Sequence, residues 1–277
     1  MSVLVVSLLI ASAIVHAGWN ALLKLSDDRL WSISIITLTG ACAAVPFALV
    51  LTPPSLQSWP YIFLSSVLQV AYCLFLIRAY RHGDLANVYP IARGSAPLMV
   101  TLGAALFARE VPGVETLIGI LLISLGILIL TSGAQRADAK TSLAALTAGG
   151  FIASYMVVDG IGVRVGTNAL GYAAWQAVIA GILIPLAYII IRRKPLPMPR
   201  GRDGLTVLIA GILSTLGYCI AVWAMSLTTM GGVSALRETS ILFAALIGVT
   251  FLKEKVSVQK ILCAVAVTAG VVIISLG

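Results

Sequence analysis

The sequence predicts an all-α polytopic membrane protein in which ten transmembrane helices form two inverted five-helix repeats around a central cavity. Three observations predict this fold. Only 10% of the 277 residues are charged, where soluble domains average about 25%, and 60% are hydrophobic, with a mean hydropathy of +1.07. Apolar stretches follow one another along the chain at the length of about 20 residues that a spanning helix needs. The third observation is an internal sequence repeat.

This composition also excludes several classes of function. So thin a polar shell cannot cover a soluble protein of this size, which excludes soluble enzymes, nucleic-acid binders and disordered chains. The chain contains no H-E-x-x-H, G-x-S-x-G or Walker motif, and His16 and His82 cannot form a metal site by themselves. Four cysteines lie inside apolar stretches: Cys42, Cys73, Cys219 and Cys263. We therefore expect no enzyme activity, no metal and no cofactor.

The first five spans are predicted at 3–24, 31–51, 60–80, 86–107 and 113–132. The charged segment Lys24–Arg29 ends the first span, and Pro53-Pro54 ends the second. Pro60 opens the third span, at a helix start where its missing N–H costs nothing. Charged breaks at Arg78–Asp84 and Arg109–Gly113 bound the fourth.

The second five spans are predicted at 142–159, 170–191, 204–226, 231–252 and 256–276. The two longest breaks, 133–140 and 192–203, precede the first and the third of these spans. Asp159 falls at the end of its span, so we expect its carboxylate to be solvated. Three tryptophans are interpreted as interfacial anchors or packing residues: Trp31, Trp59 and Trp175.

The distribution of Lys and Arg predicts the orientation of the chain. The odd-numbered connectors, counted from the N-terminus, carry fourteen of these residues, whereas the termini and the even-numbered connectors carry only Arg109 and Arg164. Such an excess marks the cytoplasmic side of a membrane. We therefore predict a multi-pass protein of a bacterial inner membrane, with both termini in the periplasm.

The two halves of the chain resemble each other. Residues 85–126 and 229–270 align at a constant offset of 144, and weaker matches extend upstream in the same order. The offset pairs Arg93 with Arg237, Ser95 with Thr239, Phe107 with Phe251, Glu110 with Glu254 and Gly126 with Gly270. We interpret this as a five-span unit repeated in 1–138 and 139–277. Because five is odd, the second copy enters the membrane from the opposite face, as in secondary transporters with inverted repeats.

Two arginines lie inside predicted spans at equivalent positions of the repeat. Arg93 lies about 12 Å into its span, close to the midplane of a core about 30 Å thick, and Arg237 lies at a similar depth. A central arginine costs about 2.5–3.5 kcal/mol on insertion scales, so each needs a reason to be there. Either they bind carbonyls freed by nearby proline or glycine, or Glu238 neutralises Arg237, or both are cationic groups facing the central cavity.

Other polar and aromatic residues mark the helix faces that would line this cavity. Tyr89 lies one turn before Arg93, and a polar stripe follows one face of the first span. The candidate substrate-binding residues are His16, Trp19, Asn20, Tyr72, Tyr89, Arg93, Tyr155, Tyr218, Arg237 and Glu238. Two of them have equally good alternatives, because His16 fits an interhelical hydrogen bond and Trp19 fits an interfacial anchor.

Three local motifs carry a family resemblance: His16-Ala-Gly-Trp-Asn20 with Lys24, Tyr89-Pro-Ile-Ala-Arg93-Gly-Ser-Ala-Pro97, and Leu236-Arg-Glu-Thr-Ser240. With the ten spans, they make the whole chain resemble EamA-type carriers of the drug/metabolite transporter superfamily. The resemblance implies that spans 1, 3, 4, 6, 8 and 9 line a central cavity and that spans 5 and 10 are peripheral. The Tyr-Pro-Ile-Ala-Arg sequence is similar to a subgroup linked to phosphonate metabolism.

Together these observations predict a secondary carrier that exports a small polar, anionic or zwitterionic metabolite by alternating access. Arg93 would bind the carboxylate or phosphonate with help from Arg237, while Glu238 would balance charge or bind an amine. The alternatives are an efflux carrier for drugs or cationic compounds and, in another class, a non-transporting membrane sensor or scaffold. The expected partners are the substrate and the lipid bilayer, without nucleic acid, for a monomer or homodimer.

Overall fold

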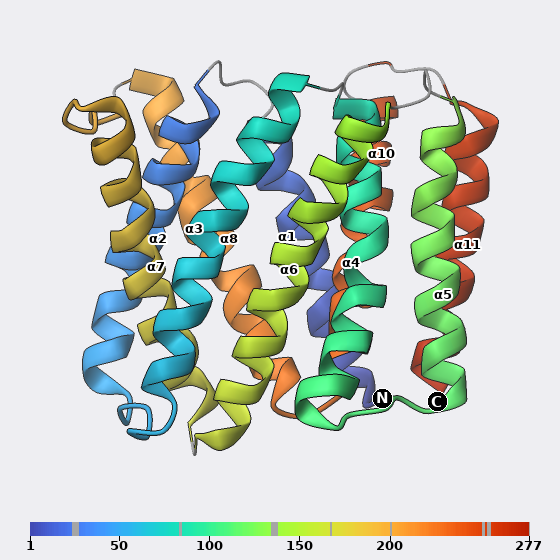
Figure 1. Ribbon diagram of the computed structural model, residues 1–277, viewed down its shortest axis with the longest axis horizontal. Coiled ribbons are helices and arrows are strands. Elements are labelled where there is room, and N and C mark those ends of the chain that lie inside the picture. The colour runs from blue at the N-terminus through green and yellow to red at the C-terminus, as the bar shows by residue number, and fades with distance from the viewer. Residues whose placement is uncertain are drawn as a thin grey trace.

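The computed structural model of the chain describes residues 1–23, 28–82, 85–133, 138–166, 168–199, 201–250, 253 and 256–276. All secondary structure in these ranges is helical (Figure 1). The first half contains α1 (Val3–Leu23), α2 (Arg29–Val50), α3 (Trp59–His82), α4 (Leu85–Ala108), α5 (Val114–Leu128) and the short 3-10 helix η1 (Ile129–Gly133). The second half contains α6 (Ala139–Val165), α7 (Ala169–Arg192), α8 (Gly201–Met225), α9 (Met230–Arg237), α10 (Ser240–Thr250) and α11 (Val258–Leu276).

These helices follow the predicted spans in order, and most of their ends lie within a few residues of the predicted ones. Over the described residues, nine helical segments are long and apolar enough to cross a membrane. The remaining predicted span, the first, contains the shorter apolar helix Val3–Trp19. The structure departs from the prediction in two places, the end of α6 and the middle of the ninth span.

Helix α6 is longer than predicted and ends at Val165. Only glycine and apolar residues follow Asp159 up to Val163, so nothing in this stretch stops the helix. The glycines also allow close packing, because a Cβ at Gly162 would lie 2.5 Å from the Cβ of Tyr61. The expectation that Asp159 is solvated is therefore wrong, and its side chain is completely buried.

The ninth span is two half-helices, α9 and α10, rather than one continuous helix. At the break, the N–H groups of Glu238 and Thr239 donate to carbonyls three residues back, those of Ala235 and Leu236, at 3.0 and 3.2 Å. The Thr239 hydroxyl donates to the same Leu236 carbonyl at 2.7 Å. Bonds of this shorter spacing tighten the backbone and end the regular α-helical ladder. Neither proline nor glycine occurs at the break, so the sequence pattern did not indicate it.

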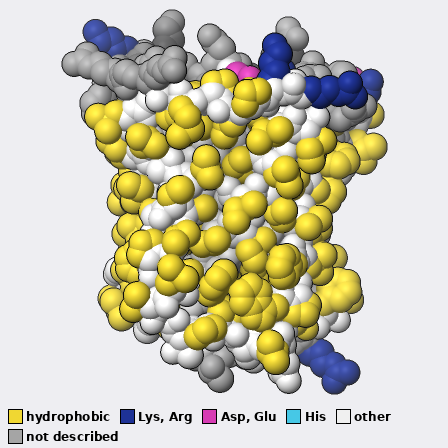
Figure 2. Space-filling model, turned by 90° about the vertical axis from the view of Figure 1, so that its left-hand side faces the viewer, with side chains coloured by type: hydrophobic (Ala, Val, Ile, Leu, Met, Phe, Trp, Pro, Cys, Tyr) yellow, Lys and Arg dark blue, Asp and Glu magenta, His cyan; other side chains and the backbone are white. Residues whose placement is uncertain are grey.

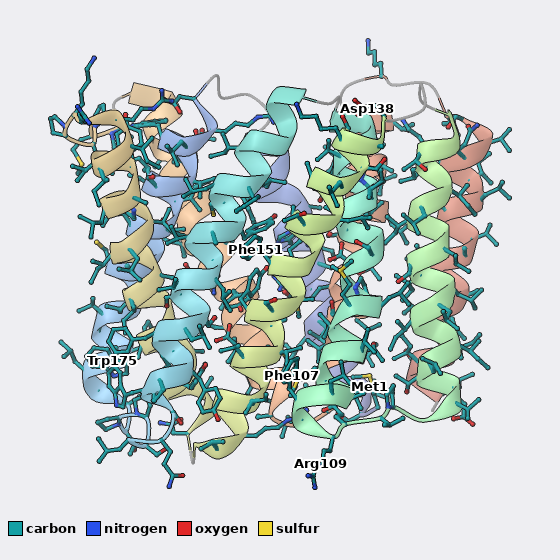
Figure 3. The ribbon with its side chains drawn as sticks, viewed as in Figure 1. Met1, Phe107, Arg109, Asp138, Phe151 and Trp175 are labelled. Atoms are coloured by element: carbon teal, nitrogen blue, oxygen red, sulfur yellow. The ribbon has the colours of Figure 1, made fainter. Side chains whose placement is uncertain are left out.

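The two halves of the chain are inverted relative to each other. Both chain termini lie at one end of the bundle (Figure 1), here called the terminal face. Met1 lies at this face, whereas Asp138, at the start of the second half, lies at the opposite face (Figure 3). Packing follows the same symmetry, since α3 packs on α6 as α8 packs on α1, and α2 packs on α8 as α7 packs on α3. The predicted all-helical fold of two inverted repeats is confirmed.

One residue after α4 and its repeat mate after α10 have the same backbone conformation. Arg109 and Lys253, which the offset of 144 pairs, both have a left-handed φ of 54°. This conformation costs roughly 1–2 kcal/mol for a residue with a side chain. Its occurrence at both positions shows that the repeat extends to the connectors. The following acidic residue, Glu110, is described below, whereas its repeat mate Glu254 lies outside the described residues.

Glycines bring α5 and α11 into close contact. A Cβ on Gly119 would lie 2.7 Å from the Gly270 carbonyl oxygen, and a Cβ on Gly270 would lie 2.7 Å from that of Gly119. The offset of 144 pairs Gly119 with Cys263 and Gly270 with Gly126. A symmetric arrangement therefore requires a second contact, between Cys263 and Gly126. That contact also exists, since a Cβ on Gly126 would lie 3.5 Å from the Cys263 carbonyl oxygen. The crossing of α5 and α11 therefore lies on the pseudo-two-fold axis.

Two helix pairs form the edges of the bundle, α2 with α7 and α5 with α11 (Figure 1). Helices α1, α3, α4, α6, α8 and α10 lie between them, so α5 and α11 have the peripheral position that the resemblance implied. Hydrophobic side chains cover the lateral surface, and Lys and Arg gather mainly at the end opposite the terminal face (Figure 2). We call this end the basic face.

Exposed positions on the two faces test the predicted orientation. In a variant lacking the four native cysteines, Ala139→Cys on the basic face should react with a membrane-impermeant maleimide only after the cells are opened. Val111→Cys, at a position 77% exposed on the terminal face, should react in cells whose outer membrane alone is permeable. The reverse labelling pattern would contradict the periplasmic location of the termini.

Candidate functional site

Arg93 joins the two repeats inside the bundle. Its side chain is 9% exposed, and Nη1 donates to Oε1 of Glu238 at 2.8 Å, so α4 is bonded to the break between α9 and α10. Nη2 contacts Nε2 of His16 on α1, and this ring nitrogen accepts because a guanidinium only donates. The guanidinium also lies over the Tyr89 ring, with 5.5 Å between its carbon and the ring centroid.

Arg237, the repeat mate of Arg93, has a different environment. It is 8% exposed at the end of α9, and its guanidinium carbon lies 5.2 Å from the centroid of the Tyr218 ring. Its buried Nε has no hydrogen-bond partner. Within the described part of the chain, this guanidinium forms neither an ion pair nor a hydrogen bond. Since arginine stays protonated in proteins, a positive charge lies in the bundle without a direct counter-ion.

Three tyrosine rings form a row beside the arginines. Tyr155 on α6 packs edge-on against Tyr72 on α3, at 5.9 Å between centroids, and against Tyr218 on α8, at 6.1 Å. Helix α6 can lie close to α4 because Gly149 has no side chain. A Cβ at this position would be only 2.8 Å from the Ala92 carbonyl oxygen. Tyr155 is buried, whereas Tyr72 and Tyr218 are half-buried. The row therefore brings side chains of three helices together beside the arginines.

A second buried carboxylate, Asp159, belongs to this cluster, although it was expected to be solvated and was not among the candidate site residues. Asp159 accepts hydrogen bonds from the hydroxyl of Tyr172 at 2.8 Å and from that of Tyr218. Tyr218 therefore has Arg237 over its ring and Asp159 at its hydroxyl, so it lies between a cation and an anion. A signal was available, because Asp159 lies one turn after Tyr155 and an apolar stretch follows it.

The other predicted site residues lie on α1. Trp19 packs edge-on against His16 at 5.1 Å, and its buried indole N–H has no partner among the described residues. The ring therefore lies inside the bundle beside the Arg93 group. Asn20 is part of α1, but its side chain lies outside the described residues.

The three tryptophans interpreted as anchors or packing residues form contacts away from the arginines. Trp59 and Trp175 pack against each other at 5.1 Å, and the indole N–H of Trp31 donates to the Pro197 carbonyl at 2.8 Å.

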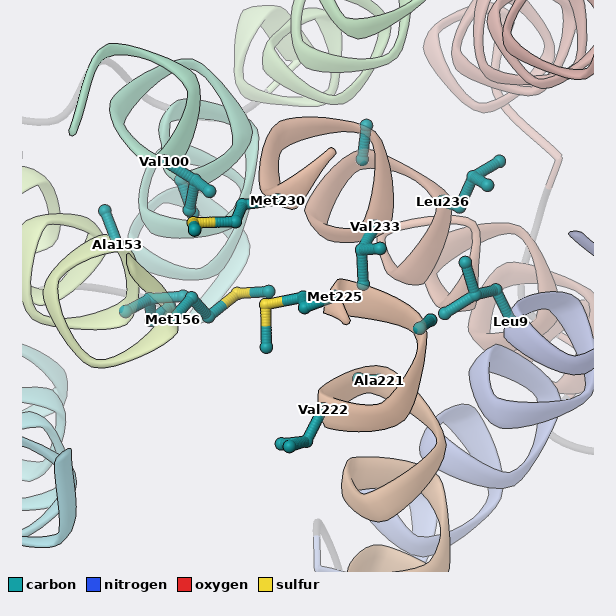
Figure 4. Close-up of a cluster of buried hydrophobic side chains, with 14 of the residues drawn as sticks. Leu9, Val100, Ala153, Met156, Ala221, Val222, Met225, Met230, Val233 and Leu236 are labelled. Atoms are coloured by element: carbon teal, nitrogen blue, oxygen red, sulfur yellow. The ribbon is translucent and has the colours of Figure 1, made fainter. Parts of the chain in front are cut away.

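Apolar packing closes the bundle between this cluster and the terminal face. Met156 on α6, Met225 on α8 and Met230 on α9 converge in one buried cluster with Val100 of α4 (Figure 4). None of these four side chains is more than 2% exposed. Because a packed interior leaves few voids large enough for water, this cluster separates the arginines from the terminal face.

An ionic contact lies beyond the apolar cluster, next to Arg109 at the terminal face (Figure 3). Glu110, after α4, pairs with Arg164, near the end of α6, at 2.5 Å. Glu110 also accepts from the backbone N–H of Met230 at 2.7 Å, and Arg164 donates to the carbonyls of Met225 and Thr228 at 2.8 and 2.7 Å. We call the Glu110–Arg164 pair with these backbone partners the terminal latch. It ties together connectors from both repeats.

This arrangement, an all-helical bundle of inverted repeats with charged side chains buried between them, is that of a secondary membrane transporter. The sequence model of the EamA-like transporter family matches residues 3–132 and 139–276. Because the match extends over nearly the whole chain, the protein belongs to the EamA-like transporter family, within the drug/metabolite transporter superfamily.

The structural comparison supports the fold alone. A solved structure described as a "crystal structure of protein" is similar with a TM-score of 0.76 and 18% sequence identity, over 99% of this chain and 96% of that chain. No curated protein matches the chain significantly.

The Asp159 cluster predicts a specific stability pattern. Asp159→Leu leaves two buried tyrosine hydroxyls without an acceptor, which costs about 1–3 kcal/mol for each one. The melting temperature in detergent should therefore fall by several degrees, and much less in Asp159→Asn, which keeps an acceptor oxygen. Adding Tyr172→Phe and Tyr218→Phe to Asp159→Leu should restore part of the loss, because the unpaired hydroxyls are then absent. Equal melting temperatures for all these variants would show that the cluster is not a stabilising unit.

Proposed function

We propose that this protein is a secondary transporter of the bacterial inner membrane that exports a small anionic or zwitterionic metabolite. The observation that carries the proposal is the state of Arg237. Its guanidinium is almost completely buried and has no hydrogen-bonded anion among the described residues. A membrane protein keeps such a costly group where it has a function, and an anionic ligand would supply the hydrogen-bond acceptor that the guanidinium lacks.

The chemistry of the neighbouring groups favours a carboxylate or phosphonate. Arg93 has a buried Nε without a partner, so its planar fork is only partly used by Glu238 and His16. Two parallel hydrogen bonds from a guanidinium match the two oxygens of a carboxylate or phosphonate. The free Oε2 of Glu238 is an acceptor for the amine of a zwitterion. Tyr72, Tyr155 and Tyr218 would enclose the rest of the molecule.

A cationic substrate is the second candidate, because one observation favours it. The row of tyrosine rings is suited to cation–π contacts, and the unpartnered Glu238 oxygen would add an anionic group. Two buried arginines disfavour this reading, since they would repel a cation at short range. Membership of a transporter family favours either carrier over a sensor or scaffold without transport.

We propose that transport proceeds by alternating access, and that the structure describes a state closed toward the terminal face. The methionine cluster and the terminal latch both lie on that side and both join elements of the two repeats. Opening this face therefore requires the latch to break and the end of α4 to separate from α6 and α9. By the inverted symmetry, the equivalent rearrangement at the basic face would close the other side.

Anion binding can be tested without knowing the natural substrate. Acetate, glycine, methylphosphonate and 2-aminoethylphosphonate are the probes, and tetraphenylphosphonium represents cations. At least one of the four carboxylate or phosphonate probes should raise the melting temperature of the purified protein. Arg237→Gln should abolish this shift. Arg93→Lys keeps the charge but loses the planar fork, so it should weaken binding about ten- to hundredfold, equivalent to the ~1.5–3 kcal/mol of a charge-assisted hydrogen bond.

Arg109→Gln is the matched control, because it removes an exposed arginine far from the site. It should leave every probe-induced shift unchanged. A wild-type response to tetraphenylphosphonium alone would replace the anion site with the cationic candidate. Normal anion binding by Arg93→Gln would mean that Arg93 has only a structural role.

The terminal latch predicts how the closed state can be opened. In a cysteine-free background, Met230→Cys is buried and should react slowly with a thiol reagent applied at the terminal face. Adding Glu110→Gln breaks the latch, and a loss of about 1 kcal/mol for a partly exposed ion pair should raise the open population and the labelling rate roughly fivefold. The control is Asp28→Asn, which breaks the exposed Arg192–Asp28 pair of 3.0 Å at the basic face. Equal labelling rates in all three proteins would rule out a gating role for the latch.

A further inference from the structure

The buried carboxylate of Glu238 has a hydrogen bond to only one of its two oxygens among the described residues. Its side chain is 3% exposed and one carboxylate oxygen accepts from Arg93, while the buried Oε2 has no hydrogen-bond partner among the described residues. It also lies at the break between α9 and α10, where the backbone leaves the regular helical ladder. Arg93 is therefore the one cation among the described residues that bonds to this carboxylate directly, while the neighbouring Arg237 acts on it only through space.

The buried charges of the cluster balance without a ligand. Arg93 and Arg237 are cations, while Glu238 accepts from a cation and Asp159 accepts from two hydroxyls, as ionised carboxylates do. The His16 ring accepts from Arg93 and is counted as neutral. These charges sum to zero. A bound anion would leave a net negative charge in an interior of low dielectric constant, which is strongly unfavourable unless a proton enters with it.

Of the two carboxylates, Glu238 is the one whose partner an anion would take. A carboxylate bound end-on by Nη1 and Nη2 of Arg93 uses the nitrogen that now holds Glu238. Asp159 keeps both of its tyrosine donors whatever binds to Arg93.

Titratable groups near the Arg93–Glu238 pair come from six helices. They are Arg93 and Tyr89 on α4, His16 on α1, Tyr72 on α3, Tyr155 and Asp159 on α6, Tyr218 on α8, and Arg237 at the end of α9. The charged residues of α5 and α11 lie in first turns at opposite faces, Glu115 and Lys260. Once Arg93 turns to a ligand, no second cation contacts Glu238 directly among the described residues.

Resting on the anion site proposed above, we propose that Glu238 couples transport to protons. The substrate anion displaces the Glu238 carboxylate from Arg93, and the displaced carboxylate binds one proton from water on the side where the anion entered. Anion and proton then cross together. When the anion leaves, Glu238 releases the proton to the same side and pairs with Arg93 again. A monovalent anion is thus moved without net charge, so the membrane potential does not act on it. Export then requires an outward gradient of the metabolite larger than the inward pH gradient.

Calorimetry measures the proton directly. Purified protein is titrated with acetate and with methylphosphonate near pH 7.5 in two buffers that differ in ionisation enthalpy, which gives the number of protons taken up for each probe bound. Wild type should take up about one proton more than Glu238→Gln, whose amide cannot exchange one. The ionisation of the probe itself contributes equally to both proteins and cancels. As the pH rises, the affinity of wild type for the probe should fall up to tenfold for each pH unit, relative to the affinity of the variant.

Asp159→Asn is the matched carboxylate-to-amide variant. It keeps the proposed proton site but removes one negative charge from the cluster, so its proton uptake should lie between that of wild type and that of Glu238→Gln. Loss of uptake in Asp159→Asn together with normal uptake in Glu238→Gln would assign the proton to Asp159 and overturn the proposal. If Glu238→Gln does not fold, the wild-type titration still decides, because probe binding without proton uptake overturns the coupling while leaving the anion site intact. If acetate, methylphosphonate, glycine and 2-aminoethylphosphonate all fail to bind to wild type, the proposed anion site is wrong, and the proposed proton coupling is then wrong as well.

Discussion

Two arginines in a membrane interior are the constraint on which the arrangement of the other central residues depends. An uncompensated guanidinium at this depth is costly, so each one needs anions, aromatic faces or polar partners nearby. Arg93 obtains them from His16, Tyr89 and Glu238, which lie on three different elements. Removing one partner of a buried ion pair typically costs about 3–5 kcal/mol, because the other charge is left unpaired. The Arg93–Glu238 pair is therefore a strong link between the repeats that exists only while both partners stay in place.

The repeat explains where the arginines lie, and its imperfections explain how they differ. Position 238 corresponds to Gly94 in the first repeat, where a Cβ would lie 2.9 Å from a side-chain carbon of Leu128. The first repeat has no room for a side chain there, whereas the second has a carboxylate. As a result, Arg93 has an ionic partner, whereas its equivalent Arg237 has none among the residues that the structure describes. An exactly symmetric pair would have had either two neutralised arginines or two free ones, and neither case would combine a bonded with an available guanidinium.

Hydropathy and the repeat were sufficient to predict the number, order and inversion of the helices, because the bilayer imposes length and apolarity on each span. Arg93, His16, Tyr89 and Glu238 were all among the candidate site residues, and the structure brings the last three into contact with Arg93, whereas the sequence had suggested Glu238 as a partner of Arg237. The break at Glu238 was not predictable in this way, since it arises from backbone bonding and the Thr239 hydroxyl rather than from proline or glycine. Asp159 was missed because the end of its span was placed too early. The latch was missed because Glu110 and Arg164 are distant in sequence, and only the packing of three connectors brings them together.

The glycine contact of α5 with α11 has a mechanical consequence. These helices meet backbone to backbone at one edge of the bundle, and α2 meets α7 at the other, so both edge pairs join a helix to its own symmetry mate. A line through the two edge pairs is therefore a suitable axis for rotation of the central helices. Each central helix of about 24 residues extends roughly 18 Å to either side of its midpoint. Tilting it by about 10° around that line would move its ends by about 3 Å in opposite directions. The same small roll that widens one mouth of the bundle must narrow the other, with little repacking where the backbones touch.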